Sequence, residues 1–486
     1  MKKLFSVLLV ALLAFSLVGC GNETSTEEDA NVTSDSYDVI VVGAGGSGLT
    51  AAIAAKEAGA NVVVFEKMGI IGGNTAVSGG EMAAPGNWLQ VAEGTEDSTD
   101  KFFEDIMNGG DNIADESLVR VLADNALDAA NWLKDEIHVP FEDYMMFFGG
   151  HSVSRSLVPA KATGSTITTS LKTKCDDLGI EIKTNHDVKE LLVDEAGKVT
   201  GVKVESEDGV EEVNAKSVIL ASGGFGSNIE MRKQYNPSMD EKISSTCTAG
   251  STGDGIAMAQ AVGAGVRDME YIQTYPTCDV DNGLLLYVGD VRLVKHAIMV
   301  NKEGKRFIEE LGRRDDLSFA ITEQTGGVCY LVFDQEGLDA ADIMDNHSAE
   351  YDSLIKRGRL VKADSLEEAA DHFEIDYDTL KETVDNWNKY CDEGADPEFN
   401  YRGTLNKISE EGPIYILTAT PSVHHTMGGL TINSDAQVLN TEGEAIEGLF
   451  ACGEVTGGIH GTNRLGSDAI AECIVFGRVA GQNAAK

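Results

Sequence analysis

The sequence predicts an α/β fold, in which a Rossmann-like dinucleotide-binding domain is interrupted by a smaller α+β domain. The first observation is at residues 37–48, YDVIVVGAGGSG, where an apolar strand run meets clustered glycines and the helical pattern LTAAIAAKEAG follows. The second is the apolar run NVVVFEK, which ends at Glu66. The third is that residues 271–418 replace this pattern with helical stretches and the hairpin-like AIMVNKEGKRF.

The glycines of the first motif suit a phosphate-binding turn. Gly43, Gly45, Gly46 and Gly48 allow the chain to turn sharply and let a pyrophosphate approach the helix N-terminus, where backbone amides and the helix dipole favour an anion. Glu66 ends the next strand at the distance expected for a carboxylate that accepts ribose hydroxyls. Strand, turn, helix and acidic strand end therefore stand in register for dinucleotide binding.

Three later segments favour FAD over NAD. The loop GGNTAVSGG at 72–80 places Asn74 and Thr75 just beyond the acidic strand end, where it could run along the flavin side of a bound dinucleotide. A later strand, SVILASGGFG, ends at Gly223, and GLFACGEVTGG places Glu454 at another strand end. An NAD enzyme needs no such returning segment, whereas a fold that closes over the ribityl chain of FAD does.

The charge of the chain limits its partners. The net charge is -42, from 38 lysines and arginines against 80 aspartates and glutamates. Such a balance argues against nucleic acid and against an anionic lipid surface as a partner. If the substrate is an anion, a local basic pocket is needed.

The N-terminus has the pattern of a secretory signal. Residues 1–19, MKKLFSVLLVALLAFSLVG, join two lysines to an apolar run, and the ending LVGC resembles the lipobox of bacterial lipoproteins. This resemblance implies lipidation of Cys20 and a membrane anchor on the extracytoplasmic face. The residues that follow are polar and acidic with no apolar period, which predicts a disordered tether over residues 20–36. Of the eight cysteines, the other seven show no disulfide framework, zinc spacing or haem-attachment motif.

A series of motifs carries a family resemblance over residues 37–486. GAGGSG, EKMGIIGGNT, LASGGFG, TGDGIAMA, NKEGKRFIEE, HHTMGGL and ACGEVTGGIHGTNRLGSDA follow one another in family order. The chain resembles the flavoprotein subunit family of fumarate reductase and succinate dehydrogenase, closest to the soluble flavocytochrome-type branch that includes urocanate reductases. By this resemblance Val188 lies near the adenine, and the contacts to FAD come from Glu66, Lys67, Asn74, Thr75, Gly79, Gly80, Asp254, Glu454, Ser467 and Ile470.

The resemblance also implies a domain plan. Residues 37–270 and 419–486 form the two parts of the FAD-binding domain, and residues 271–418 form a mobile cap, or clamp, over flavin and substrate. Closure of such a cap excludes water, which strengthens electrostatic stabilisation at the reacting atoms.

The chemistry implied is the reduction of a polarised C=C bond conjugated to a carboxylate, which cationic donors should hold. Arg464, in HGTNRLG, suits a bidentate carboxylate contact. His424 or His425, in SVHHTMGG, could donate to the same group, and the family spacing to Arg464 selects His424. In GKRFIEELGRRDD the resemblance makes Arg314 the catalytic acid, with Arg313 as a close rival.

Two further assignments stay open at this stage. The family re-protonates its arginine through a carboxylate and a second arginine, and YVGDVRLVK offers Asp290 and Arg292. The family pattern there is Glu-x-x-Arg, so the spacing differs by one residue. The adjacent histidines also suggest a metal, but neighbours in a strand point to opposite faces and no third ligand is apparent, so no metal site is predicted.

Residues 275–277, Tyr-Pro-Thr, bear on the substrate. A tyrosine before proline is commonly an ordinary strand-edge residue, but fumarate reductases of this branch carry His-Pro-Thr there, whose histidine binds the second carboxylate. Urocanate reductases have a tyrosine, like Tyr275, and an aspartate about fifteen residues on, like Asp290. Phe147, or Phe148, is placed to stack on a planar ring. The resemblance thus implies reduction of urocanate to dihydrourocanate (imidazole propionate), with fumarate or an aryl acrylate as alternatives.

Two other classes of protein are less consistent with these residues. A flavin electron shuttle needs no set of three cationic groups, and a steroid-type dehydrogenase needs tyrosines as acid and base with a wide apolar cleft. The sequence carries no haem motif. We therefore expect an external electron donor, such as an FMN-bearing or quinol-linked membrane protein, in anaerobic respiration.

Overall fold

The computed structural model describes residues 36–409 and 412–486. The predicted signal, Cys20 and nearly all of the predicted tether lie outside these residues, and the first strand begins at Ser36, one residue before the predicted start of the domain. Among the described residues, no helix is both long enough and apolar enough to cross a membrane.

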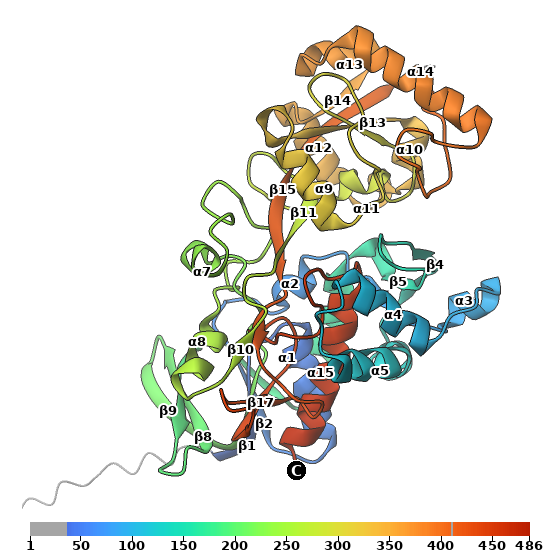
Figure 1. Ribbon diagram of the computed structural model, residues 1–486. Coiled ribbons are helices and arrows are strands. Elements are labelled where there is room, and N and C mark those ends of the chain that lie inside the picture. Colours follow the sequence, from blue (N-terminus) through green and yellow to red (C-terminus); the bar gives the residue numbers. More distant parts are fainter. Residues whose placement is uncertain (1–35, 410–411) are drawn as a thin grey trace, which may run out of the picture. The chain divides into compact units, whose positions relative to one another are not determined.

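The largest sheet confirms the predicted α/β class (Figure 1). Strands β18, β9, β1, β2 and β6 are parallel neighbours, and the two predicted dinucleotide strands pair directly, with Val39 opposite Val62. β17 pairs antiparallel at one edge, and β7 and β8 extend the sheet from β9. The strands are β1 (Ser36–Val42), β2 (Val62–Glu66), β6 (Glu181–Thr184), β7 (Asp187–Val193), β8 (Val199–Ser206), β9 (Gly209–Leu220), β17 (Gln437–Leu439) and β18 (Ala445–Ala451).

Helices α1 (Gly46–Glu57) and α15 (Asp468–Ala484) pack closely beside this sheet, because small residues line their contact. A Cβ at Gly481 would lie 2.3 Å from the carbonyl oxygen of Ala51, so only glycine permits this approach. The remaining helices of this part are α2 (Gly73–Ala76), α3 (Trp88–Glu93), α4 (Thr99–Gly109), α5 (Glu116–Asp135), α6 (Gly164–Asp177), α7 (Ile229–Tyr235) and α8 (Asp254–Ala261).

Two small sheets complete this part of the chain. One has the order β3-β5-β4, and the other pairs β10 with β16. Their strands are β3 (Met82–Ala83), β4 (Phe141–Met146), β5 (Ser156–Pro159), β10 (Val266–Arg267) and β16 (Gly429–Leu430).

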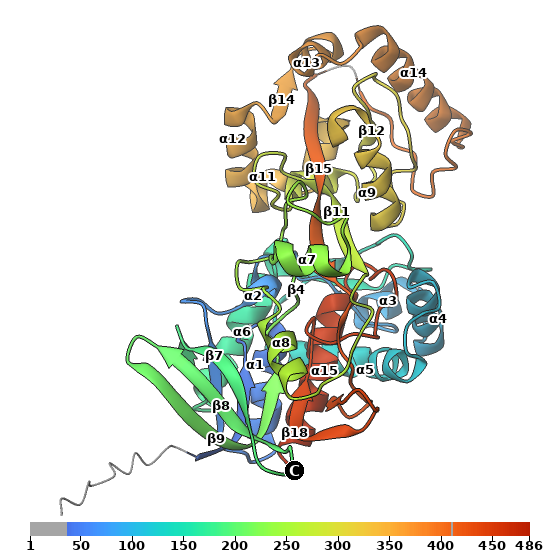
Figure 2. The ribbon, with the colours of Figure 1, turned by 60° about the vertical axis from the view of Figure 1, so that its left-hand side comes forward.

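A separate five-stranded sheet forms mainly from the segment predicted as the cap, and its strand β15 continues past residue 418 (Figure 2). Its strands are β11 (Ile272–Cys278), β12 (Ile298–Val300), β13 (Cys329–Asp334), β14 (Leu360–Ala363) and β15 (Ile414–Thr426). This part of the chain has two buried hydrophobic clusters, both formed by residues between 286 and 419. β15 pairs with β13 up to Ala419 and with β11 from Thr420 onward, so it links this sheet to the segment that returns to the main one. The limits of a cap at 271–418 stay a prediction.

The helices of this segment begin and end at residues that favour such ends. Ser365 caps α13 through the amide of Glu368, Asp376 caps α14 through the amide of Thr379, and Gly394 ends α14 with φ 72°. The helices are α9 (Arg314–Thr322), α10 (Gln335–Ala340), α11 (Ile343–Asn346), α12 (Ser348–Arg357), α13 (Leu366–Phe373) and α14 (Tyr377–Glu393), with 3₁₀ turns at Tyr287–Val291 and Thr325–Gly327. A further 3₁₀ turn, Ala160–Ala162, lies in the FAD-binding part of the chain.

Candidate active site

One cavity of about 270 Å³ brings most of the predicted site residues together. The predicted cofactor contacts that line it are Gly43, Gly45, Gly46, Glu66, Lys67, Asn74, Thr75, Gly79, Gly80, Val188, Gly223, Asp254, Glu454, Ser467 and Ile470. Gly48 is not in this lining. A Cβ at Gly48 would lie 1.9 Å from the carbonyl oxygen of Gly43, so its role in the structure is the close approach of α1 to the strand.

The dinucleotide end of the cavity fits a pyrophosphate and a ribose. Gly43 has φ 105°, and a Cβ there would lie 2.4 Å from the carbonyl oxygen of Ala221. Gly45, the N-cap residue of α1, makes no side-chain cap, and the amide of Gly46 donates to Thr75 Oγ1 at 3.3 Å. The amides at such a helix N-terminus favour an anion. The two carboxylate oxygens of Glu66 accept the amides of Ala44 and Met68, each at 2.8 Å, and these bonds hold the carboxylate at the cavity edge.

Polar contacts fix the loops further along the cavity. Although burial raises the pKa of Asp254, hydrogen bonds from Lys67 and Thr252 hold it below its usual range, and Lys67 Nζ lies 2.5 Å from its carboxylate. Asn74 Nδ2 donates to Glu454 Oε2 at 3.1 Å, and burial raises the pKa of Glu454. The residues present therefore fit FAD, with glycines where backbone must come close and polar groups where ribityl oxygens need partners.

The predicted substrate residues meet at the other end of the cavity. The Tyr275 hydroxyl donates to Asp290 Oδ1 at 3.3 Å, and its ring centre lies 5.1 Å from that of His424. The Arg314 guanidinium stands over the Tyr275 ring at 4.8 Å and over the Phe148 ring at 5.5 Å. Aromatic faces thus surround one arginine, an arrangement that keeps water from its charge.

Arg314 and Arg464 form the anion-binding part of this end. Within the described part of the chain, Arg314 Nη1 and Arg464 Nε are buried without a hydrogen-bond partner. Burial, and then the positive charge of Arg314, lower the pKa of Arg464 to about 9, and burial also lowers the pKa of Arg314. Two buried arginines that keep free donors are suited to receive a carboxylate.

His424 and Asp290 complete the polar groups. Burial, followed by the charge of Arg464, lowers the pKa of His424 well below its usual value, so the ring is neutral. Its Nδ1 lies 2.8 Å from Thr246 Oγ1, and a neutral imidazole can still donate one hydrogen bond. Burial, and then the negative charge of Glu81, raise the pKa of Asp290 to about 8.

Two further predicted residues lie outside the cavity lining. Phe148 lines the cavity and Phe147 does not, because the chain turns after β4 ends at Met146. Arg292 is buried outside the lining, where its Nη1 donates to the carbonyl oxygen of Glu310 at 2.6 Å, and its charge lowers the pKa of Asp290 against the larger effects of burial and Glu81. The relay through Asp290 and Arg292 stays a prediction.

The start of α9 distinguishes Arg314 from its rival Arg313. Arg314 is its first helical residue and faces the cavity, whereas Arg313 precedes it and binds Asp111 at 2.9 Å and Asp315 at 2.7 Å. Arg313 is therefore engaged in ion pairs at a partly exposed position. Arg314 is the arginine that can reach a substrate.

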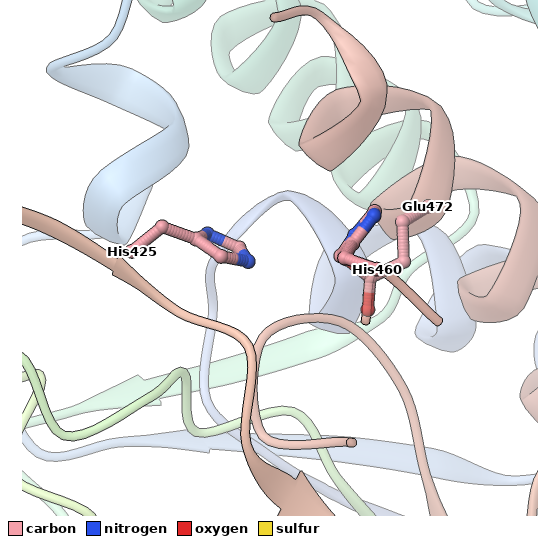
Figure 3. Close-up of side chains that lie close together, drawn as sticks. All are labelled: His425, His460 and Glu472. Atoms are coloured by element: carbon pink, nitrogen blue, oxygen red, sulfur yellow. The ribbon is translucent and has the colours of Figure 1, made fainter. Parts of the chain in front are cut away.

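Several polar residues of the cavity were missed by sequence reasoning. Glu81 and Tyr287 line it, and His425 joins His460 and Glu472 in a buried cluster whose ligand atoms lie within 4.8 Å of one another (Figure 3). His460 comes from the HGTNRLG motif and Glu472 from α15, and of the two adjacent histidines His425 belongs to this cluster and His424 does not. His460 Nε2 and Glu472 Oε2 are already hydrogen-bonded at 2.8 Å, so the cluster is a polar network in which His425 and Glu472 line the cavity wall.

Comparison with known proteins identifies the family. Residues 38–470 match the model of the FAD binding domain family. The chain belongs to this family. Its cofactor is FAD, and it is a flavoprotein oxidoreductase, as the motif series predicted.

Relatives of this FAD-binding chain are reductases. It is 53% identical over 451 residues to the urocanate reductase of Eggerthella lenta, covering 92% of this chain and 74% of that one. It is 39% identical over 460 residues to a cytochrome-type fumarate reductase of Shewanella frigidimarina, covering 94% and 78%. The open conformation of a flavocytochrome c3 fumarate reductase superposes with a TM-score of 0.77 at 39% identity, covering 93% and 78%.

Proposed function

We propose that the chain is a FAD-dependent reductase of an α,β-unsaturated carboxylate, and that its substrate is urocanate, reduced to dihydrourocanate. The observation that carries the proposal is that Arg314 and Arg464 line the same cavity as Tyr275 and Asp290, which are hydrogen-bonded to each other. The 53% identity to a urocanate reductase supports the same substrate.

Each group has a role in this reaction. FAD, once bound and reduced by the external electron donor, would supply the hydride for the β-carbon of the alkene. Arg464 and His424 bind the carboxylate and stabilise the negative charge that develops on it. Arg314 gives a proton to the α-carbon, so that one hydride and one proton together saturate the double bond. Phe148 packs on the ring, which the hydroxyl of Tyr275 and the carboxylate of Asp290 orient.

The same arrangement disfavours fumarate. Its second carboxylate would face Tyr275, which is neutral, and Asp290, which offers no positive charge in either protonation state. A histidine at position 275 would offer a cationic donor instead. An aryl acrylate would place a phenyl ring beside a carboxyl that it cannot bind, at a cost in desolvation.

The test compares three substrates on purified, FAD-loaded protein. Oxidation of dithionite-reduced methyl viologen is followed with urocanate, fumarate and cinnamate in parallel. We expect kcat/KM for urocanate to exceed the others at least a hundredfold, about 3 kcal/mol of transition-state preference. Equal or faster turnover of fumarate would contradict the choice of urocanate as substrate. If none of the three acids is turned over, both parts of the proposal, the reductase activity and the substrate, are contradicted.

We also propose a location and an electron source. The signal-like residues 1–19 and the lipobox-like LVGC support lipidation of Cys20 and a place on the outer face of the cell membrane, where a membrane-bound donor would reduce the flavin. Metabolic labelling with an alkynyl fatty acid tests this. Label and membrane association should both be lost on Cys20→Ala and kept on Cys175→Ala, which changes a buried thiol.

A further inference from the structure

We infer that Glu350 is a positioning residue of the substrate site, whose carboxylate holds the 3₁₀ turn Tyr287–Val291 so that Asp290 faces the ring of the substrate. Glu350 lies outside the cavity lining. Its Oε1 accepts the amide of Val288 at 2.7 Å, and its Oε2 accepts the amide of Tyr287 at 3.2 Å. The inference rests on the function proposed above and adds to it a residue that acts without touching the substrate.

The 3₁₀ turn has one face toward the cavity and the other toward a hydrophobic cluster. Side chains three residues apart lie above one another in such a turn. Accordingly, Tyr287 and Asp290 both line the cavity, whereas Val288 and Val291 are fully buried in one of the two clusters of the cap segment. A rotation of the turn would therefore move Tyr287 and Asp290 together.

The first amides of this turn are bound by a group from another helix. Leu286 precedes the turn and offers no side-chain cap, so these amides need acceptors from elsewhere. Glu350 supplies them from the first turn of α12. Leu354, one helical turn further along α12, is buried in the same cluster as Val288, and residues four apart share a helix face. This packing directs Glu350 toward the 3₁₀ turn.

A second contact joins the 3₁₀ turn to the start of α12. The ring of His347, the residue before α12, stacks on the ring of Tyr287 with the ring centres 4.2 Å apart and the planes 2° apart. The Tyr287 hydroxyl donates to the carbonyl oxygen of Val77 at 3.0 Å, in the loop predicted to contact FAD. The turn that carries Asp290 is therefore held between α12 and this loop.

The charge of Glu350 is stabilised mainly by the two amides. Burial raises the pKa of Glu350 to about 7, and the amides of Val288 and Tyr287 lower it. Arg357 of the same helix already pairs with Asp279 at 2.6 Å. Removal of the carboxylate would leave both amides without this acceptor, and hydrogen bonds to a charged group contribute more than neutral ones. The turn would then lose the contact that fixes its first residues.

The experiment is a double-mutant cycle in the FAD-loaded protein, because a positioning residue acts through the residue that it positions. Glu350→Ala should raise KM for urocanate about tenfold and change kcat less than about threefold, and Glu350→Gln, which keeps one acceptor oxygen, should raise KM only about threefold. In an Asp290→Ala background, either change should alter KM less than about twofold. Asp352→Asn is the matched control, because it removes a negative charge from an exposed position of α12.

A binding measurement and thermal unfolding separate positioning from folding. Calorimetric titration of the oxidised protein with imidazole propionate should give a Kd about tenfold higher in Glu350→Ala and unchanged in Asp352→Asn. If thermal unfolding shows that Glu350→Ala does not fold, Glu350→Gln decides by the same cycle and titration.

The outcomes distinguish the two proposals. If wild type does not reduce urocanate, the proposed function fails. If wild type reduces it, three results overturn the inference about Glu350 alone: an equal rise in KM with and without Asp290→Ala, a loss in kcat without a change in KM, or no change in either.

Discussion

Replacement of Arg314 by methionine separates the role of this residue in catalysis from its role in folding. The guanidinium is buried, keeps Nη1 without a partner among the described residues and lies over two aromatic rings. A methionine of similar length fills the same space without a charge. Its neighbour Arg313 provides the matched control, because Arg313→Met removes a partly exposed arginine paired with Asp111 and Asp315.

The two variants should differ in the size of their effect on kcat/KM and in the sign of their effect on the free energy of unfolding. A charge about 4 Å from the developing carboxylate charge contributes roughly 4 kcal/mol at an effective dielectric constant of about 20, which corresponds to about a thousandfold in kcat/KM. Loss of a buried charge that burial disfavours should leave the free energy of unfolding equal or raise it by about 1–4 kcal/mol. Arg313→Met should cost about 0–1 kcal/mol of stability and change activity less than twofold.

The assays are viologen-linked turnover and thermal unfolding of the same FAD-loaded samples. Arg314→Met should be folded, flavin-loaded and nearly inactive, and Arg314→Lys should recover part of kcat, because it keeps the charge without the planar donor fork. The reasoning is refuted if Arg313→Met loses more activity than Arg314→Met, or if Arg314→Met keeps activity within tenfold of wild type.

Three further changes give distinct outcomes. Tyr275→His should raise kcat/KM for fumarate at least tenfold and lower it for urocanate, in the same viologen assay. Burial raises the pKa of Asp290 to about 8 from 3.8, so between about pH 4 and 8 the unfolded chain loses this proton and the native one keeps it. Wild type therefore loses stability as pH rises through this window, and the Tm advantage of Asp290→Asn over wild type should grow from pH 4 to pH 8; a constant difference would contradict the shift. Gly43→Ala should abolish FAD retention, because its Cβ would lie 2.4 Å from the carbonyl oxygen of Ala221, whereas Gly59→Ala, with φ 97° and no neighbour within 4 Å, should keep bound flavin measured by visible absorbance.

The fold could be predicted from the sequence because its signals are local. The run before Gly43 is apolar throughout, and the glycines, helix and acidic strand end follow at short distances, so strand, turn and helix are each specified by neighbouring residues. The helical stretches predicted within residues 271–418 include α13 and α14, which in the structure begin after side-chain caps at Ser365 and Asp376. The cap limits are harder to place, because β15 runs through the predicted boundary and only its partners change there, between Ala419 and Thr420.

The site was predictable only where a motif carries it. Arg464 and His424 lie in glycine-rich motifs, and the structure brings both to the cavity. The choice between adjacent residues depends on where an element begins or ends, and α9 begins at Arg314. Glu81 gave no signal, since an acidic residue after two glycines is ordinary in a chain with 80 acidic residues. Its place in the cavity follows from tertiary packing alone.

A chain with a net charge of -42 can bind an anionic substrate because two buried arginines line this cavity. Arg314 and Arg464 repel one another, and burial disfavours both charges, so the free protein holds two cations that a carboxylate would relieve. Part of the binding free energy of any carboxylate therefore comes from removing this repulsion, and every unsaturated acid gains it equally. Selection among acids must come from what faces the rest of the ligand, where Tyr275, Asp290 and Glu81 line the cavity and offer no positive charge. A dicarboxylate gains nothing further from the arginines once they are paired, and its second carboxylate finds no cation among these three residues.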